Sequence, residues 1–200
     1  MRLNGNVPGV AEARLKWLNF CATALRIAHA FFIDETGLYT NCQPNLGWSY
    51  EGTRVSSDAP IKREKNRTVI GAVNMYGDFI TDTYEGGTTS ERFIDFLKKL
   101  KKSMGPDDFI IMDNMRTHHS KAVMEFLDKE HIKALFLPAY SPDFNPIERV
   151  WSLFKGMVRK FRPINGETLL TAISQSLSAI SATKIMNIVQ CDLYTSKEID

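Results

Sequence analysis

The sequence has few cysteines and lacks any long hydrophobic run. Its 200 residues include three cysteines, Cys21, Cys42 and Cys191, which lie far apart and form no Cys-x-x-Cys motif. This odd, scattered set excludes a disulfide framework and a cysteine-ligated zinc site, and it favours a reducing, intracellular compartment. No apolar stretch approaches the roughly 20 residues that a membrane-spanning helix needs. Charged residues interrupt the first 20 positions, so we expect neither a secretion signal nor a membrane anchor.

An excess of charge of one sign is also missing. The 25 Lys and Arg residues nearly balance the 23 Asp and Glu residues, and the formal net charge is +2. Overall charge therefore does not indicate a nucleic-acid partner, and only a local basic cluster could do so. Hydrophobic residues make up 44% and charged residues 24% of the chain, which excludes disordered and fibrous proteins. Without repeats or a linker, the length predicts one domain over residues 1–200.

Hydrophobic patterning predicts that strands and helices alternate through most of the chain. We expect helices over residues 10–27, from Ser90, from Ser120, from Pro146 and over 167–188, and short strands over 30–33, 68–74, 79–84, 109–112 and 134–137. The residues between the second and third strands, 75–78, predict a hairpin turn. Apolar residues at helical spacing predict a buried stripe on two of the helices. These are Phe93, Phe96, Leu97 and Leu100 on the helix from Ser90, and Ile147, Val150, Trp151, Phe154, Val158 and Phe161 on the helix from Pro146. This order is typical of an α/β domain with a mixed sheet flanked by helices.

Three carboxylates fall where such a fold forms its ligand crevice, at strand ends and at a helix start. We expect Asp34 to close the first strand, Asp113 to close a later buried strand, and Glu148 to lie in the first turn of the helix after Pro146. Carboxylate oxygens are the ligands that Mg²⁺ prefers. Two divalent ions held by such acids can clamp the attacking and leaving oxygens of a phosphoryl displacement.

Each of these acids also has a purely structural interpretation. Asp34 can be an ordinary turn residue, and Asp113 with Asn114 can form an Asx turn. Glu148 can complete a capping box in which Asn145 is the N-cap residue. Spacing alone leaves these alternatives open.

Three local strings resemble the mariner-like superfamily of transposases, which includes a bacterial insertion-sequence branch. They are residues 32–35 (Phe-Ile-Asp-Glu), residues 112–114 (Met-Asp-Asn) with His118, and residues 137–151 (Leu-Pro-Ala-Tyr-Ser-Pro-Asp-Phe-Asn-Pro-Ile-Glu-Arg-Val-Trp). The second and third acids are separated by 34 residues, which is the spacing typical of the family's D-D-E triad. The resemblance covers about residues 28–162.

The resemblance implies a ribonuclease H-like fold and a DDE catalytic domain. Asp34, Asp113 and Glu148 would then be the catalytic and metal-binding triad, holding two Mg²⁺ or Mn²⁺ ions. Asn114 and His118 would lie near the site, in supporting or substrate-contacting roles. The implied activity is that of a cut-and-paste transposase: an endonuclease cleaves a phosphodiester at an element end, and the freed 3′-hydroxyl attacks target DNA.

Basic residues follow the third acid and indicate where DNA would lie. Arg149, Lys155, Arg159 and Arg162 occur in a stretch without acidic residues, and the last three share a helical face with Glu148. A second basic cluster, residues 62–67, contains Lys62 and Arg63. Both sets suit phosphate contacts. Alternatively, the first set can be an ordinary solvent-exposed helix face, and the second can be an ordinary solvent-exposed loop. The implied partner is double-stranded DNA, both at the ends of the element and at the target. The resemblance is also compatible with a homodimer.

The chain also departs from the family pattern. Members normally carry paired helix-turn-helix modules before the catalytic domain, whereas only about 27 residues precede the first strand here, so we expect these modules to be absent. Two other functions are possible for such a chain. It can be a nuclease that only cuts DNA, or a catalytically silent DNA-binding or scaffold protein that keeps the fold. The implied location is the nucleus in a eukaryote, or the cytoplasm and nucleoid in a bacterium.

Overall fold

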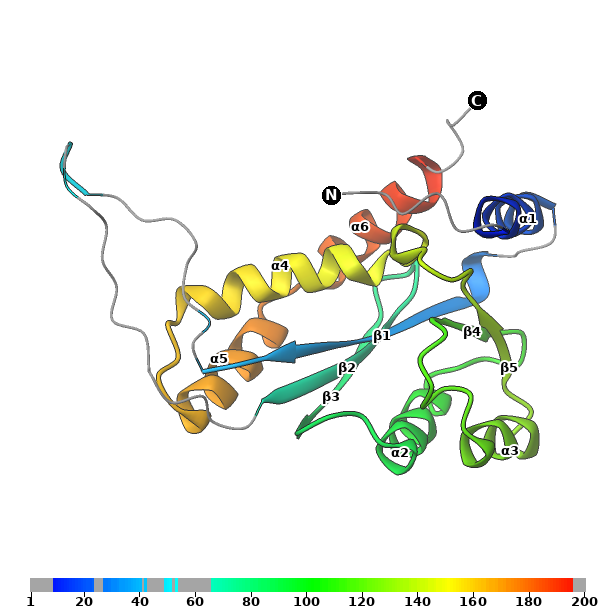
Figure 1. Cartoon of the computed structure of the whole chain (residues 1–200), viewed down its shortest axis with the longest axis horizontal. Helices are drawn as coiled ribbons and strands as arrows, with labels where there is room; N and C mark the ends of the chain where they lie inside the picture. The colour runs from blue at the N-terminus through cyan, green and yellow to red at the C-terminus, as the bar shows by residue number, and fades with distance from the viewer. Residues whose placement is uncertain are drawn as a thin grey trace.

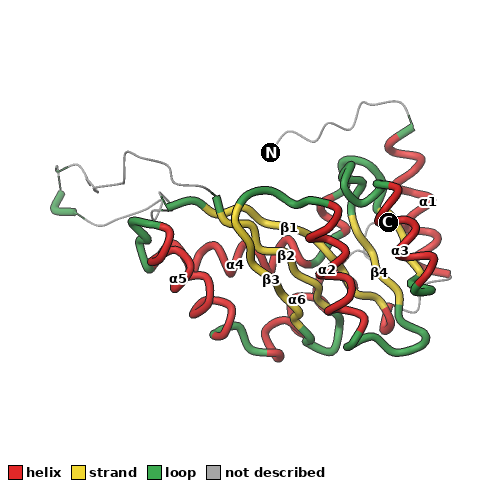
Figure 2. The backbone as a smooth tube through the Cα atoms, turned by 90° about the horizontal axis from the view of Figure 1, so that it is seen from below, coloured by secondary structure: helices red, strands yellow, loops and turns green. Residues whose placement is uncertain are grey.

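A five-stranded sheet with helices on both faces organises the chain (Figures 1 and 2). The computed structural model describes residues 9–23, 27–40, 42, 49–51, 53 and 66–195. Its elements, in chain order, are α1 (Val10–Thr23), η1 (Ile27–His29), β1 (Ala30–Leu38), β2 (Arg67–Val73), β3 (Phe79–Glu85), α2 (Ser90–Lys101), β4 (Phe109–Met112), α3 (Lys121–Lys129), β5 (Lys133–Phe136), η2 (Pro142–Phe144), α4 (Ile147–Lys160), α5 (Gly166–Ser178) and α6 (Ala182–Thr195). Among these helices, none combines the length and the apolar character needed to cross a membrane.

The sheet is mixed, as the sequence predicts, with strand order β3-β2-β1-β4-β5. β1, β2 and β3 are antiparallel neighbours, whereas β4 and β5 run parallel to β1 on its other side. The predicted hairpin joins β2 to β3, because the Asn74 side-chain oxygen accepts the backbone N–H groups of Tyr76 and Asp78 at 3.0 Å each. The α/β class and the order of elements are therefore confirmed.

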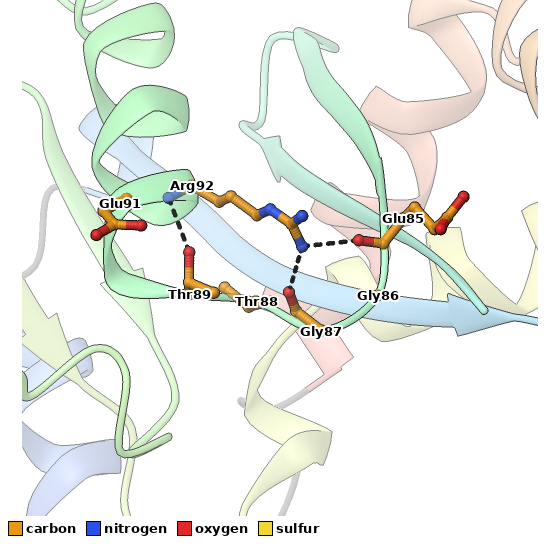
Figure 3. A pocket seen from close by; sticks show the side chains of 7 residues that line it. All are labelled: Glu85, Gly86, Gly87, Thr88, Thr89, Glu91 and Arg92. Atoms are coloured by element: carbon orange, nitrogen blue, oxygen red, sulfur yellow. Dashed lines mark hydrogen bonds between the residues drawn. The ribbon is translucent and has the colours of Figure 1, made fainter. Parts of the chain in front are cut away.

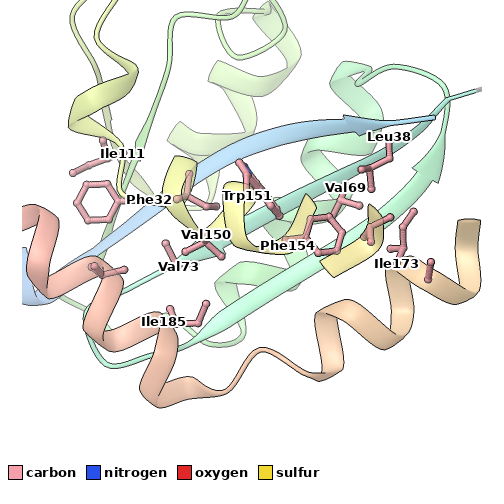
Figure 4. Close-up of a cluster of buried hydrophobic side chains, with 14 of the residues drawn as sticks. Phe32, Leu38, Val69, Val73, Ile111, Val150, Trp151, Phe154, Ile173 and Ile185 are labelled. Atoms are coloured by element: carbon pink, nitrogen blue, oxygen red, sulfur yellow. The ribbon is translucent and has the colours of Figure 1, made fainter. Parts of the chain in front are cut away.

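Two hydrophobic clusters lie on opposite faces of the sheet. Because successive strand residues point to opposite faces, Phe32 of β1 joins the cluster under α4, α5 and α6 (Figure 4). Its neighbours Phe31 and Ile33 join the cluster under α2 and α3. The predicted apolar stripe of α2 is confirmed, and all of its members are fully buried: Phe93, Phe96, Leu97 and Leu100.

The first strand is longer than its apolar run predicts, and the expected turn after Ile33 is wrong. β1 continues to Leu38, because β2 provides a paired neighbour along its whole second half, from Asp34 opposite Gly71 to Leu38 opposite Arg67. Asp34 therefore lies in the middle of the strand. The turn interpretation of this acid is excluded.

The helical region expected over 167–188 is present, but the structure divides it into two helices, α5 and α6. The break comes after Ala179, and Ser181 starts the next helix by accepting the Lys184 N–H on its side-chain oxygen at 3.3 Å. On α4 the buried stripe runs only as far as Val158, since Phe161, which was expected to continue it, is 49% exposed.

Gly71 allows close packing between the sheet and α4. A Cβ atom at this position would lie 2.7 Å from Cη2 of Trp151 and 3.2 Å from Cε2 of Phe79. We expect Gly71→Ala to lower the free energy of unfolding by about 1–3 kcal/mol, because a fully buried indole must move to accept the methyl group. Urea unfolding of both proteins measures this difference.

Gly37→Ala is the matched control, because it changes a glycine of the adjacent strand whose added Cβ would have no neighbour within 4 Å. This variant should be as stable as the original protein or slightly more stable. Equal losses in the two variants would contradict the packing argument.

Candidate active site

The three acids that the sequence singles out line one cavity of about 400 Å³. The last parallel pair of β1 and β4 joins Phe32 to Ile111, so Asp34 and Asp113 each lie two residues beyond it, at the same edge of the sheet. Glu148 reaches the cavity from the first turn of α4. The remaining lining residues come from the segments after β4 and β5: Asn114, Met115, Leu137, Pro138, Ala139, Tyr140, Ser141, Pro142 and Asn145.

Asp34 is held from the α4 side of the sheet. The indole N–H of Trp151 donates to Oδ2 of Asp34 at 3.0 Å, and Trp151 follows Glu148 by one turn of the same helix. Burial, followed by the negative charges of Glu148, Glu35 and Asp113, raises the pKa of Asp34 to about 8. The cavity therefore contains a carboxyl group whose ionised form is unfavourable without a compensating cation.

Asp113 is held by the opposite kind of partner. Nδ1 of the fully buried His118 lies 2.9 Å from Oδ1 of Asp113, and its Nε2 lies 3.2 Å from Oε1 of Glu35. The His118 hydrogen bond lowers the pKa of Asp113. Burial alone would lower the His118 pKa, but the bonds to Asp113 and Glu35 raise it to about 10. The Asx turn considered for this acid also forms, since Oδ1 accepts the Met115 N–H at 3.0 Å.

Glu148 does not belong to a capping box, so that alternative is wrong. α4 begins after Pro146 without a side-chain cap, and the Asn145 N–H that Glu148 would have to bond donates to the Pro142 carbonyl at 3.0 Å. The buried amide of Asn145 instead donates to the Ile33 carbonyl at 3.1 Å. This bond ties the start of α4 to β1, directly beside Asp34.

Asn114 and His118 both lie at the site, in different environments. The Asn114 amide donates to the Leu137 carbonyl and its oxygen lies 3.1 Å from Nε2 of His119, so it joins the ends of β4 and β5. His118 is fully buried and packs against the ring of Phe93 at 4.4 Å. Its burial supports a role in orienting Asp113 and leaves it no surface for substrate.

Sequence reasoning missed three contributors to this geometry: Glu35, Trp151 and Asn145. Glu35 could have been found by extending the period-two alternation of β1, which places adjacent acids on opposite faces. The patterning marks Trp151 only as a core residue, and Asn145 only as a helix cap. Nothing in the local sequence shows which distant atom either side chain contacts.

The structure describes one of the two sets of basic residues that were proposed to contact DNA. Lys155 and Arg159 lie half-buried on α4, and Arg149 is exposed near its start. Arg162 is exposed just after the helix, with a φ of 48°. The second cluster, with Lys62 and Arg63, lies outside the described residues.

The donor chemistry of the cavity fits a divalent cation. All three acids offer carboxylate oxygens, which suit Mg²⁺ or Mn²⁺. The pKa of Asp34 is raised by burial and then by neighbouring negative charges, and a cation would offset both effects. Within the described part of the chain, however, no three His, Cys, Asp or Glu side chains already converge on a common point. The carboxylates would therefore have to draw together around a bound ion.

A larger cavity of about 570 Å³ lies between β3 and α2, away from these acids (Figure 3). Its one cation, Arg92, donates to the carbonyl oxygens of Glu85 and Gly87, at 2.8 Å each, and lies over the ring of Tyr84. These contacts brace the connection from β3 to α2. The carboxylate-lined cavity is the better candidate for chemistry.

Comparison with known proteins gives a family and two groups of relatives. The family model described as "DDE superfamily endonuclease" matches residues 29–170. An uncharacterized 39 kDa protein of insertion element IS630 from Shigella sonnei is 27% identical over 124 residues, which is 60% of this chain and 36% of that protein. The Tcb2 transposase of Caenorhabditis briggsae is 32% identical over 77 residues, or 38% of this chain and 28% of the transposase. The chain thus spans about a third of the length of these curated relatives.

Solved structures share the fold. The catalytic domain of Mos1 mariner transposase superposes with a TM-score of 0.72 at 14% identity, covering 99% of this chain and 94% of that domain. The Mos1 paired-end complex with the left transposon end gives 0.74 at 17% identity, covering 94% of this chain and 59% of the transposase chain. The expected ribonuclease H-like mixed sheet flanked by helices is thereby confirmed.

The raised pKa of Asp34 makes stability depend on pH. A carboxyl group whose pKa rises on folding stabilises the protein below its unfolded pKa, and this contribution is lost as the pH approaches the folded value. We therefore expect Asp34→Asn, measured with a chelator present, to gain stability relative to the original protein between pH 4 and 8. The gain should grow from near zero at pH 4 and exceed about 1.4 kcal/mol, the equivalent of one pKa unit, as the pH approaches 8. Urea unfolding at each pH measures it.

Asparagine keeps an oxygen that can accept the Trp151 N–H, so this variant isolates the charge. Asp128→Asn, an exposed position on α3, is the control and should follow the original protein at every pH. Parallel pH profiles for Asp34→Asn and the original protein would show that the pKa of Asp34 does not rise on folding.

Proposed function

The chain belongs to the DDE superfamily of endonucleases, and on that premise we propose that it is the metal-dependent catalytic domain of a cut-and-paste transposase. It would cleave phosphodiester bonds at the ends of a DNA element and join the freed 3′-hydroxyl to target DNA. One observation carries the proposal: Asp34, Asp113 and Glu148 come from three rigid elements and line a single cavity. The family of the chain makes a phosphodiester the expected substrate of such a cavity.

In this proposal the three acids hold the cations and the protein around them sets their orientation. Two bound Mg²⁺ or Mn²⁺ ions would supply charge neutralisation at the phosphate and activation of water. Trp151 fixes one carboxylate oxygen of Asp34 from the α4 side of the sheet. His118 fixes Asp113 from the other face of the sheet. Neither supporting residue needs to contact DNA, and no covalent protein–DNA intermediate is required.

Double-stranded DNA would approach along the side of α4 that Glu148 begins. The half-buried Lys155 and Arg159 follow Glu148 on this side, beside the buried stripe of Trp151 and Phe154. A phosphate backbone placed there would lead from the cavity along the helix. We further propose that the chain acts as one catalytic domain inside the cell, in the nucleus or in a bacterial cytoplasm.

Glu148→Gln tests the catalytic assignment. Glutamine is nearly isosteric but is a poor ligand for a hard cation, so nicking of supercoiled plasmid with Mn²⁺ should fall by about a hundredfold or more. Stability should change by less than about 0.5 kcal/mol, because Glu148 is exposed and caps nothing. Nicking time courses and thermal melts of the same preparation measure both quantities.

Glu167→Gln is the matched control, since Glu167 occupies the first turn of α5 and does not line the cavity. It should nick DNA at the original rate. Full nicking by Glu148→Gln would remove this residue from the site, and an inactive original protein would favour a silent member of the family.

The double change Lys155→Ala and Arg159→Ala tests the DNA path. Each phosphate contact contributes about −0.9 to the slope of log K against log salt on duplex DNA, so the slope should become shallower by about two units. Binding should weaken alike for unrelated sequences, because phosphate contacts carry no sequence information. Fluorescence anisotropy over a range of salt concentrations measures the slope.

Lys98→Ala with Lys102→Ala is the control, because these exposed lysines lie at the end of α2, on the opposite face of the sheet. The control should keep the original slope. An unchanged slope in the α4 variant would place DNA elsewhere, with Lys62 and Arg63 the next candidates.

A further inference from the structure

Arg14 of α1 makes an unusually complete set of contacts with the segment that leads into α4. Its Nη1 donates to Oγ of Ser141 and to Oδ1 of Asp143, both at 2.9 Å, and its Nη2 donates to Oδ2 of Asp143 at 2.5 Å. The guanidinium carbon also lies 4.3 Å from the ring centroid of Phe144. Three residues of one segment are thus held by a single side chain, which lies 127 residues before the first of them.

The contacted segment forms one wall of the proposed active site. Residues 137–142 line the cavity, and Ser141 is buried although its neighbours are exposed. The backbone carbonyl of Asn145 then accepts the N–H of Glu148 at 3.1 Å. A shift of η2 (Pro142–Phe144) would therefore move the first turn of α4, which carries Glu148 into the cavity.

We propose that Arg14 is a positioning residue for the active site: by holding Ser141, Asp143 and Phe144, it sets where Glu148 lies relative to Asp34. The inference rests on the function proposed above. It also extends the catalytic unit, because α1 lies before residues 29–170, which the family model matches.

The geometry separates this contact from an ordinary surface ion pair. Exposed pairs usually contribute little to stability, but a bidentate guanidinium–carboxylate pair fixes direction as well as distance. The hydrogen bond from Arg14 also lowers the pKa of Asp143. The added hydroxyl bond and the stacked Phe144 ring leave the segment few alternative positions.

Four variants test the proposal. Arg14→Ala removes all the contacts, and Arg14→Lys keeps the charge but loses the bidentate geometry of the guanidinium group. The double exchange Arg14→Asp with Asp143→Arg restores an ion pair in the reverse sense. Lys16→Ala is the matched control, because Lys16 pairs with Glu12 at 2.7 Å on the same helix, in an exposed position away from the cavity.

The first readout is amide hydrogen exchange at residues 144–148, followed by mass spectrometry, and it does not depend on activity. We expect exchange there to accelerate by about tenfold in Arg14→Ala, since the backbone bonds of Phe144, Asn145 and Glu148 would open more often. Arg14→Lys should be intermediate, the double exchange should recover part of the protection, and Lys16→Ala should match the original protein. Unchanged exchange in Arg14→Ala would overturn the proposal even if the protein proves inactive on DNA.

The second readout is plasmid nicking with Mn²⁺, separated into kcat and KM for DNA. We expect Arg14→Ala to lower kcat by about tenfold to a hundredfold, the range expected for a displacement of about 1 Å at a reacting group, with KM unchanged within twofold. The double exchange should recover part of kcat.

An increase in KM with a shallower salt slope and an unchanged kcat would mean that Arg14 contacts DNA itself, and would overturn the positioning role. If the original protein does not nick DNA, with or without Mn²⁺, the proposed function is refuted instead. In that case the exchange measurement still decides whether Arg14 holds the segment.

Discussion

Strand β1 presents two neighbouring carboxylates to opposite faces of the sheet, and each helical layer is tied to one of them. Asp34 points toward α4, where it accepts the indole N–H of Trp151. Glu35 points toward α2 and α3, where it lies 3.2 Å from the imidazole of His118. The alternation of a strand makes this arrangement unavoidable once both acids lie within β1. Because His118 also holds Asp113, the two faces of the sheet are linked through the edge where the cavity opens.

Much of the fold could be predicted from the sequence, because most elements have a strong local period. The hairpin of β2 and β3, the stripe of α2 and the mixed sheet follow from apolar spacing and turn residues that lie close together in the chain. The end of β1 could not be predicted, since the partner that extends it to Leu38 is a distant strand. The separation of α5 from α6 was missed because apolar residues continue across Ala179 and Ile180.

The proposed site divides along the same line between local and distant information. Its three acids could be predicted because spacing and flanking strings mark them. Most of their supporting contacts could not, because they join residues far apart: 117 positions for Trp151 with Asp34, 83 for His118 with Glu35, and 127 for Arg14 with Ser141. The contact of His118 with Asp113 is the local one, since five positions separate the two residues. Residue types alone allow many partners for an indole, an imidazole or a guanidinium. Only the folded chain shows which of them are made.

The environments of Asp34 and Asp113 explain how acidic groups can share a cavity without a cation. Asp34 receives a neutral donor and is largely desolvated, so its pKa rises to about 8 and the group is mostly protonated at neutral pH. Asp113 receives a histidine whose pKa of about 10 keeps it charged, so this carboxylate stays ionised. The protein thus limits repulsion by neutralising one acid with a proton and pairing the other with an imidazolium. Glu148 is exposed at the start of α4 and can then face Asp34 and Asp113 with less repulsion, since one of them is neutral and the other is paired.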